Sequence, residues 1–132
     1  SLGSILGEGA SGRIYRATWH GAPDDCTRDV AVKLFKGAMT SDGLPASEMA
    51  ACLAAGGHPQ LIGALGKLQD HPDGIPGLVM PLMDSVSLPL AGPPSLESCT
   101  RDIYPDGPGL DAPSAVRLLR DIAAAALLLH DQ

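Results

Sequence analysis

Apolar and polar positions alternate along two short stretches near the start of the chain. In RIYRATW, residues 13–19, every second residue would lie on the same face, and the stretch is rich in aromatic and β-branched residues. In VAVKLF, residues 30–35, one face would carry Val30, Val32 and Leu34, and the other Ala31, Lys33 and Phe35. A period of two predicts a β-strand for each stretch.

Two later stretches have helical signals. PASEMAACLAAG, residues 45–56, opens with Pro45, has Ala and Leu in its interior, and ends at Gly56 and Gly57. In residues 111–130, Asp111 can cap the start and Pro113 suits the first turn. There the apolar residues form a stripe at helical spacing: Val116, Leu119, Ile122, Ala123, Ala126 and Leu127. The pattern predicts one helix in each stretch.

The connecting segments are rich in turn-forming residues. QDHPDGIPG, residues 69–77, predicts a turn with Asp73 and Gly74 at its tight point. Residues 85–110 are rich in Pro, Gly and Ser, with a short helix expected near residues 96–102. The chain shows no internal repeat.

Length, composition and charge limit the possible classes. A chain of 132 residues suffices for one domain with a modest core, and aromatics at 3% leave that core to Ala, Leu, Ile and Val. The formal net charge is −6 and there is no run of Lys or Arg, so we expect neither a nucleic-acid nor a membrane partner. The longest apolar run, residues 122–129, is too short to span a bilayer.

The cysteines predict neither a disulfide framework nor a metal pair. Cys26, Cys52 and Cys99 are far apart and odd in number, and His58 has no partner at ligand spacing. No secretory signal is visible at the start. We therefore expect a cytoplasmic protein without a metal site in this stretch.

The first chemistry-bearing motif is GEGASGRIY, residues 7–15, which has the Gly-x-Gly-x-x-Gly spacing of phosphate-binding loops. Such a loop either opens the helix of a dinucleotide-binding unit or turns between two strands. A dinucleotide-binding unit needs an amphipathic helix after Gly12, whereas the residues that follow have strand character. The pattern therefore favours a strand–turn–strand flap.

The second motif is Lys33, which lies in the middle of an apolar strand. Alone, such a lysine is usually an edge or surface residue, because a buried ammonium needs an anion or a carboxylate. After a glycine loop, phosphate binding becomes the favoured interpretation. Glu48, in the next predicted helix, is either a first-turn acid or the partner of Lys33, and its order and spacing favour the partner role.

Together, GEGASGRIY, the pair Trp19 and Gly21, and VAVK resemble the small lobe of a eukaryotic-type protein kinase. The Trp–Gly pair is most similar to the tyrosine-kinase-like group, whose members mostly phosphorylate Ser and Thr. The resemblance implies an α+β fold: a kinase-like small lobe with an antiparallel five-stranded sheet and one helix, then a hinge and the first helix of a truncated helical lobe.

The resemblance also implies roles for particular residues. Lys33 would hold the ATP phosphates, Glu48 would orient Lys33, and Ala31 would leave room beside the adenine. His58 in HPQL would anchor a turn, with Gln60 in place of the family's usual Asn. The implied ATP-binding set is Leu6, Gly7, Glu8, Gly9, Ala10, Ser11, Gly12, Ile14, Ala31, Lys33, Met80, Leu82 and Met83, without a metal ligand.

Within that set, the end of GLVMPLMD, residues 77–84, would form the hinge that reads adenine. Met80 would be the gatekeeper, although ordinary core packing explains a methionine there equally well. Pro81 has no N–H, so the backbone donor to adenine would be Met83.

The resemblance divides the chain into residues 1–83 as the small lobe, 84–110 as the connection, and 111–132 as the start of the large lobe. The family's H-R-D, D-F-G and A-P-E motifs, which include the Mg²⁺ ligands, are not in this sequence. We therefore expect the ATP-binding portion of a Ser/Thr-type protein kinase, inactive by itself, whose protein substrate is unknown. The alternatives are a pseudokinase scaffold and a truncated remnant without a function.

Overall fold

The computed structural model describes residues 2–20, 27–39, 43–87, 90 and 109–130. The sheet strands are β1 (Leu2–Glu8), β2 (Gly12–Trp19), β3 (Arg28–Phe35), β4 (Gly66–Leu68) and β5 (Gly77–Pro81). The helices are α1 (Pro45–Ala54), between β3 and β4, and α2 (Ala112–His130), at the end of the described chain.

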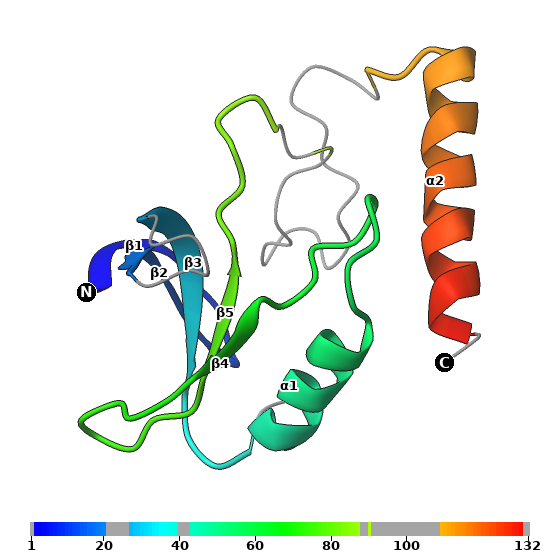
Figure 1. Ribbon diagram of the computed structural model, residues 1–132. Helices are drawn as coiled ribbons and strands as arrows, with labels where there is room; N and C mark the ends of the chain where they lie inside the picture. The colour runs from blue at the N-terminus through cyan, green and yellow to red at the C-terminus, as the bar shows by residue number, and fades with distance from the viewer. Residues whose placement is uncertain (1, 21–26, 40–42, 88–89, 91–108, 131–132) are drawn as a thin grey trace.

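The strands form one antiparallel sheet in the order β1-β2-β3-β5-β4 (Figure 1). The central strand β3 pairs with β2 on one side and with β5 on the other, so β4 lies at the edge although it precedes β5 in the chain. This arrangement confirms the predicted α+β fold with an antiparallel five-stranded sheet.

The register of β3 decides which residues share a sheet face. Ile14 on β2 lies opposite Lys33, and on the other side Leu78 of β5 also lies opposite Lys33. Ala31 lies opposite Met80. Because directly opposed residues point to the same side of a sheet, these five residues share one face, called here the Lys33 face.

Each face of β3 carries its own apolar cluster. On the Lys33 face, Phe35 and Leu78 pack against Met49 of α1, and each of the three is less than 9% exposed. On the opposite face, Ala17, Val30, Val32 and Leu34 form the second cluster. The alternation predicted for residues 30–35 is therefore confirmed, and α1 covers the face on which Lys33 lies.

The turns around α1 and β5 follow the predicted residues. The end of α1 is closed by N–H groups of Ala55 and Gly56, which donate to carbonyls of the last turn, and Gly56 has a φ of 64°. Between β4 and β5, the N–H of Gly74 donates to the carbonyl of His71 at 2.8 Å, and Gly74 has a φ of 65°.

The helix α2 stands to one side of the sheet and α1 (Figure 1). Its start is capped as predicted, because Asp111 Oδ1 accepts a hydrogen bond from the N–H of Ser114 at 2.8 Å. In the described part of α2 the buried residue is Ala125, whereas the predicted stripe stays exposed, with Val116 and Leu119 each 66% exposed. The predicted short helix near residues 96–102 lies outside the described residues.

No helix in the described ranges is long and apolar enough to cross a membrane.

Candidate functional site

The glycine loop joins β1 to β2 as a tight turn. The N–H of Gly9 donates to the carbonyl of Gly12 at 2.9 Å, and β2 begins at Gly12. The strand–turn–strand interpretation is therefore confirmed, and the dinucleotide-binding alternative is excluded because a strand follows the loop instead of a helix.

The three glycines of the loop have different surroundings. A Cβ on Gly12 would lie 2.4 Å from the carbonyl oxygen of Leu34, so a side chain does not fit between β2 and β3 at this point. A Cβ on Gly7 or Gly9 would meet nothing within 4 Å. The space beside Gly7 and Gly9 is therefore open, as a loop that receives a ligand requires.

Lys33 and Glu48 meet between β3 and α1. Lys33 Nζ lies 2.5 Å from Glu48 Oε1, and the side chains are only 16% and 23% exposed. The ammonium also lies 4.8 Å from the centre of the Phe35 ring, which limits its movement on one side. The second carboxylate oxygen, Glu48 Oε2, is buried and accepts no hydrogen bond from the described residues.

The position of Glu48 depends on the start of α1 and on the packing of the residue that follows it. It lies in the first turn of α1, which starts at Pro45, and the next residue, Met49, is buried against the sheet. Packing of Met49 sets the rotation of the helix, and that rotation brings the carboxylate beside it to β3. Lys33 and Glu48 are 15 residues apart in the chain.

The other predicted residues are partly brought together. Ile14, Ala31 and Met80 share the Lys33 face by register, and Ala31 is 7% exposed. Leu6 on β1 is 49% exposed, and Met83, two residues after β5 ends, is 53% exposed. The register thus brings Ile14, Ala31 and Met80 to one face, whereas Leu6 and Met83 are exposed on β1 and after β5.

His58 anchors a turn, as predicted. Its Nδ1 accepts a hydrogen bond from the N–H of Gln60 at 3.2 Å. His71 repeats the arrangement with the N–H of Asp73, also at 3.2 Å. In the described part of the chain, no group of three or more His, Cys, Asp or Glu could hold a metal ion.

Two charged residues at the loop were not part of the predicted site. Lys36 and Arg13 both contact the carboxylate of Glu8. The ammonium of Lys36 and then the guanidinium of Arg13 hold the pKa of Glu8 below its ordinary value. The sequence shows only the charges of these residues. Lys36 lies just after a predicted strand, and the residues that it contacts across the sheet depend on the strand register, which the local pattern does not specify.

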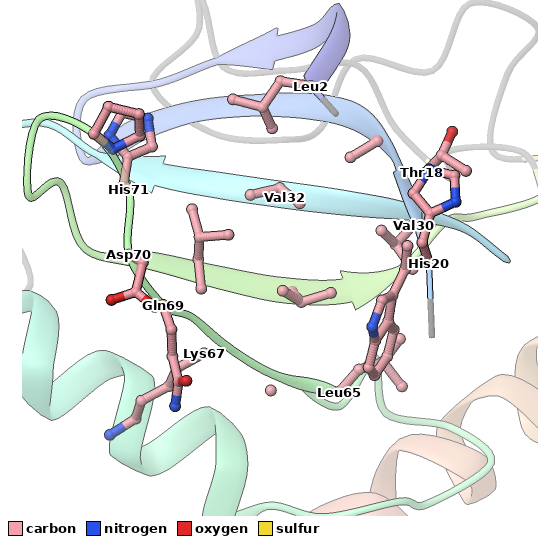
Figure 2. Close-up of a pocket in the computed structure, with 16 residues that line it drawn as sticks. Leu2, Thr18, His20, Val30, Val32, Leu65, Lys67, Gln69, Asp70 and His71 are labelled. Atoms are coloured by element: carbon pink, nitrogen blue, oxygen red, sulfur yellow. The ribbon is translucent and has the colours of Figure 1, made fainter. Parts of the chain in front are cut away.

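A separate apolar groove of about 760 Å³ lies on the face opposite to Lys33. Figure 2 shows Val32 of β3 between Leu2 of β1 and Leu65 before β4, with Val30 farther along β3 beside Thr18 and His20. None of the predicted site residues lines it. Position on the sheet therefore separates this groove from the Lys33 face.

Residues 1–132 match the family described as protein tyrosine and serine/threonine kinase. The match covers the whole chain, and the antiparallel five-stranded sheet with its two helices is consistent with it. The chain therefore belongs to the protein tyrosine and serine/threonine kinase family, whose members are transferases that generally use ATP and Mg²⁺. No curated protein matches the chain.

Proposed function

We propose that this chain binds ATP on the Lys33 face, and that it serves a protein kinase that transfers the γ-phosphoryl group to Ser or Thr hydroxyls. The preference for Ser and Thr rests on Trp19 and Gly21, the pair that resembles the tyrosine-kinase-like group. The observation that carries ATP binding is the part-buried contact of Lys33 with Glu48 on the face that also holds Ile14, Ala31 and Met80.

The phosphate end of the proposed site is formed by Lys33 and the glycine loop. A part-buried ammonium interacts strongly with an anion, because less water screens it than at the surface. Glu48 holds the ammonium in place before the anion arrives, which reduces the ordering that binding requires. The open space beside Gly7 and Gly9 lets a phosphate approach the loop backbone, from Gly7 through Ala10 and Ser11 to Gly12.

The adenine end is formed by apolar residues and the segment after β5. Ala31 and Met80 lie side by side across β3 and β5, and Ile14 and Leu6 would cover the base from above. Pro81 ends β5 and has no N–H, so the backbone N–H of Met83 would donate to adenine, with Leu82 beside it. In this division, residues 1–83 form the nucleotide lobe, 84–110 the connection, and 111–132 the start of the next lobe.

ATP supplies the phosphoryl group, and the chain's residues bind and orient it. The described residues provide a cation, a loop and apolar side chains for ATP, but no group of three or more His, Cys, Asp or Glu that could hold a metal ion. The proposal therefore assigns no magnesium ligand to them and no catalytic step to this chain.

The test is ATP binding by calorimetry, with and without Mg²⁺, for the chain and for Lys33→Met. A charge-assisted hydrogen bond contributes about 1.5–3 kcal/mol, so we expect Lys33→Met to weaken binding by about tenfold or more. The control is Lys67→Met, since Lys67 is an exposed lysine on β4 in the same row of the sheet. The ATP affinity of Lys67→Met should stay within about twofold of that of the original chain, because substitutions of exposed residues usually have small effects.

Circular dichroism must first show that each sample is folded, since Lys33→Met leaves the Glu48 carboxylate without its cation. Equal affinity of the chain and Lys33→Met would disprove the role of Lys33. A folded chain that does not bind ATP would disprove the proposed function.

A further inference from the structure

The glycine loop is tied to the end of β3 by one residue, Lys36. Its backbone N–H donates to the carbonyl of Ser11 at 3.0 Å. Its ammonium donates to the carbonyl of Gly9 at 3.2 Å and also contacts the Glu8 carboxylate. Lys36 follows β3 directly, so these three contacts join the loop to the strand that carries Lys33.

The carboxylate of Glu8 connects the contacts to both strands of the hairpin. Glu8 on β1 lies opposite Arg13 on β2, and Arg13 Nε is 3.1 Å from Glu8 Oε2. The other oxygen of the same carboxylate, Oε1, receives Lys36. One carboxylate thus links β1, β2 and the end of β3.

The loop is held in place by polar contacts and not by apolar packing. Glu8, Gly9 and Ala10 are exposed, and a Cβ at Gly9 would touch nothing within 4 Å. A segment without buried apolar contacts opens at a low free-energy cost. The position of the loop relative to the end of β3 therefore depends on a small number of hydrogen bonds and ion pairs.

We propose that Lys36 is a positioning residue for the nucleotide. Lys36 acts by holding the tip of the glycine loop beside the end of β3. The role rests on the proposed function, since it matters only if the loop covers phosphates. Lys33 would contact the phosphates directly, whereas Lys36 would act through Glu8 and the Gly9 carbonyl. Both side chains of the Lys36–Glu8 pair are about two-fifths exposed, at 40% and 44%, so solvent screens the pair and its effect should be modest.

The first measurement is amide hydrogen exchange of residues 8–13 without nucleotide, for the chain and for Lys36→Met. The variant keeps the backbone contact to Ser11 and removes only the ammonium, so the fold should persist. We expect exchange in the loop to become about three- to tenfold faster, the range that one or two exposed polar contacts produce. Lys36→Arg keeps the charge and should restore most of the protection.

A matched pair of variants tests whether the effect is specific to the ion pair at the loop or follows the loss of any exposed ion pair. Glu8→Gln removes the carboxylate that receives Lys36, whereas Asp29→Asn removes the carboxylate that receives Arg16 at 2.5 Å, in a similarly exposed pair. Glu8→Gln should accelerate loop exchange, and Asp29→Asn should leave it unchanged. Loop exchange that Lys36→Met leaves unchanged, or that Asp29→Asn accelerates equally, would overturn the proposal.

The second measurement compares the affinities for ATP and adenosine. Lys36→Met should weaken ATP by about three- to tenfold and adenosine by less than twofold, because only ATP reaches the loop. The loss of ATP affinity in Glu8→Gln combined with Lys36→Met should be smaller than the sum of the two single losses, because both variants remove the same Lys36–Glu8 contact. Equal loss for both ligands, or an additive double variant, would overturn the positioning role.

The two proposals fail in different ways. If the original chain binds no ATP, the proposed function is wrong, and the exchange data alone decide whether Lys36 holds the loop. If ATP binds and exchange accelerates while the affinity of Lys36→Met is unchanged, the loop contact is real but does not position the nucleotide, which overturns this inference.

Discussion

The sheet with α1 and the helix α2 differ sharply in how they bury the same residue types. Leu78 on β5 is 1% exposed and packs against Phe35 and Met49, whereas Leu119 on α2 is 66% exposed. Both regions have apolar residues at the correct spacing for their element. The first buries them in two clusters, whereas α2 buries Ala125 and leaves its larger apolar side chains mostly exposed.

This difference shows where stability is located. The sheet and α1 have an apolar cluster on each face of β3, so they gain free energy from burial. The helix α2 depends on its cap, on Ala and Leu propensity, and on the local hydrogen bonds of its 19 residues. We therefore expect α2 to open locally while the sheet stays folded.

The largest expected effect comes from the same truncation made in both regions. Leu78→Ala should lower the free energy of unfolding by about 2–5 kcal/mol, because it leaves a cavity between β5 and α1. Leu119→Ala should change it by less than about 0.5 kcal/mol, since the side chain is already in water. Urea denaturation followed by Trp19 fluorescence measures both. Equal losses would mean that the α2 stripe is buried in solution.

A second, smaller contrast tests the glycine loop within the sheet region. Gly12→Ala should cost about 1–3 kcal/mol, because the new methyl group would overlap the Leu34 carbonyl and push β2 from β3. Gly9→Ala should change stability by less than about 0.5 kcal/mol, since the space there is open. The same denaturation experiment decides, and a tolerated Gly12→Ala would contradict the close approach of the two strands.

The smallest effect concerns the cap of α2 and its dependence on pH. Hydrogen bonds from the Ser114 hydroxyl and then its backbone N–H lower the pKa of Asp111 from the ordinary value of 3.8. The ionised cap therefore stabilises the helix above pH 3.8, and this contribution is lost as the pH falls through the lowered pKa. Helicity measured by circular dichroism should decrease there.

Asp111→Asn provides the control for that titration. The amide oxygen can still accept the Ser114 N–H but does not ionise, so the acid-induced loss of helicity from the cap should disappear. If Asp111→Asn loses helicity at low pH as the original chain does, the loss comes from other carboxylates and not from the cap.

Local patterns in the sequence determined most of the fold. The alternation in residues 30–35 placed Val32 and Lys33 on opposite faces, because strand geometry leaves no other choice. Pro45 and Gly56 marked the limits of α1, and Asp111 marked the start of α2, since each satisfies a local backbone requirement. The kinase resemblance implied that Lys33 pairs with Glu48, and the two side chains are in contact in the structure.

Only the tertiary structure decided which distant groups meet at the glycine loop. Lys36 and Glu8 are 28 residues apart, and nothing in the local pattern of either residue selects the other. Their contact requires the β1–β2 and β2–β3 registers together, which place the end of β3 beside the loop tip. Likewise, the apolar spacing of α2 predicted a helix, but its exposure depends on the surrounding elements, because burial is a property of packing.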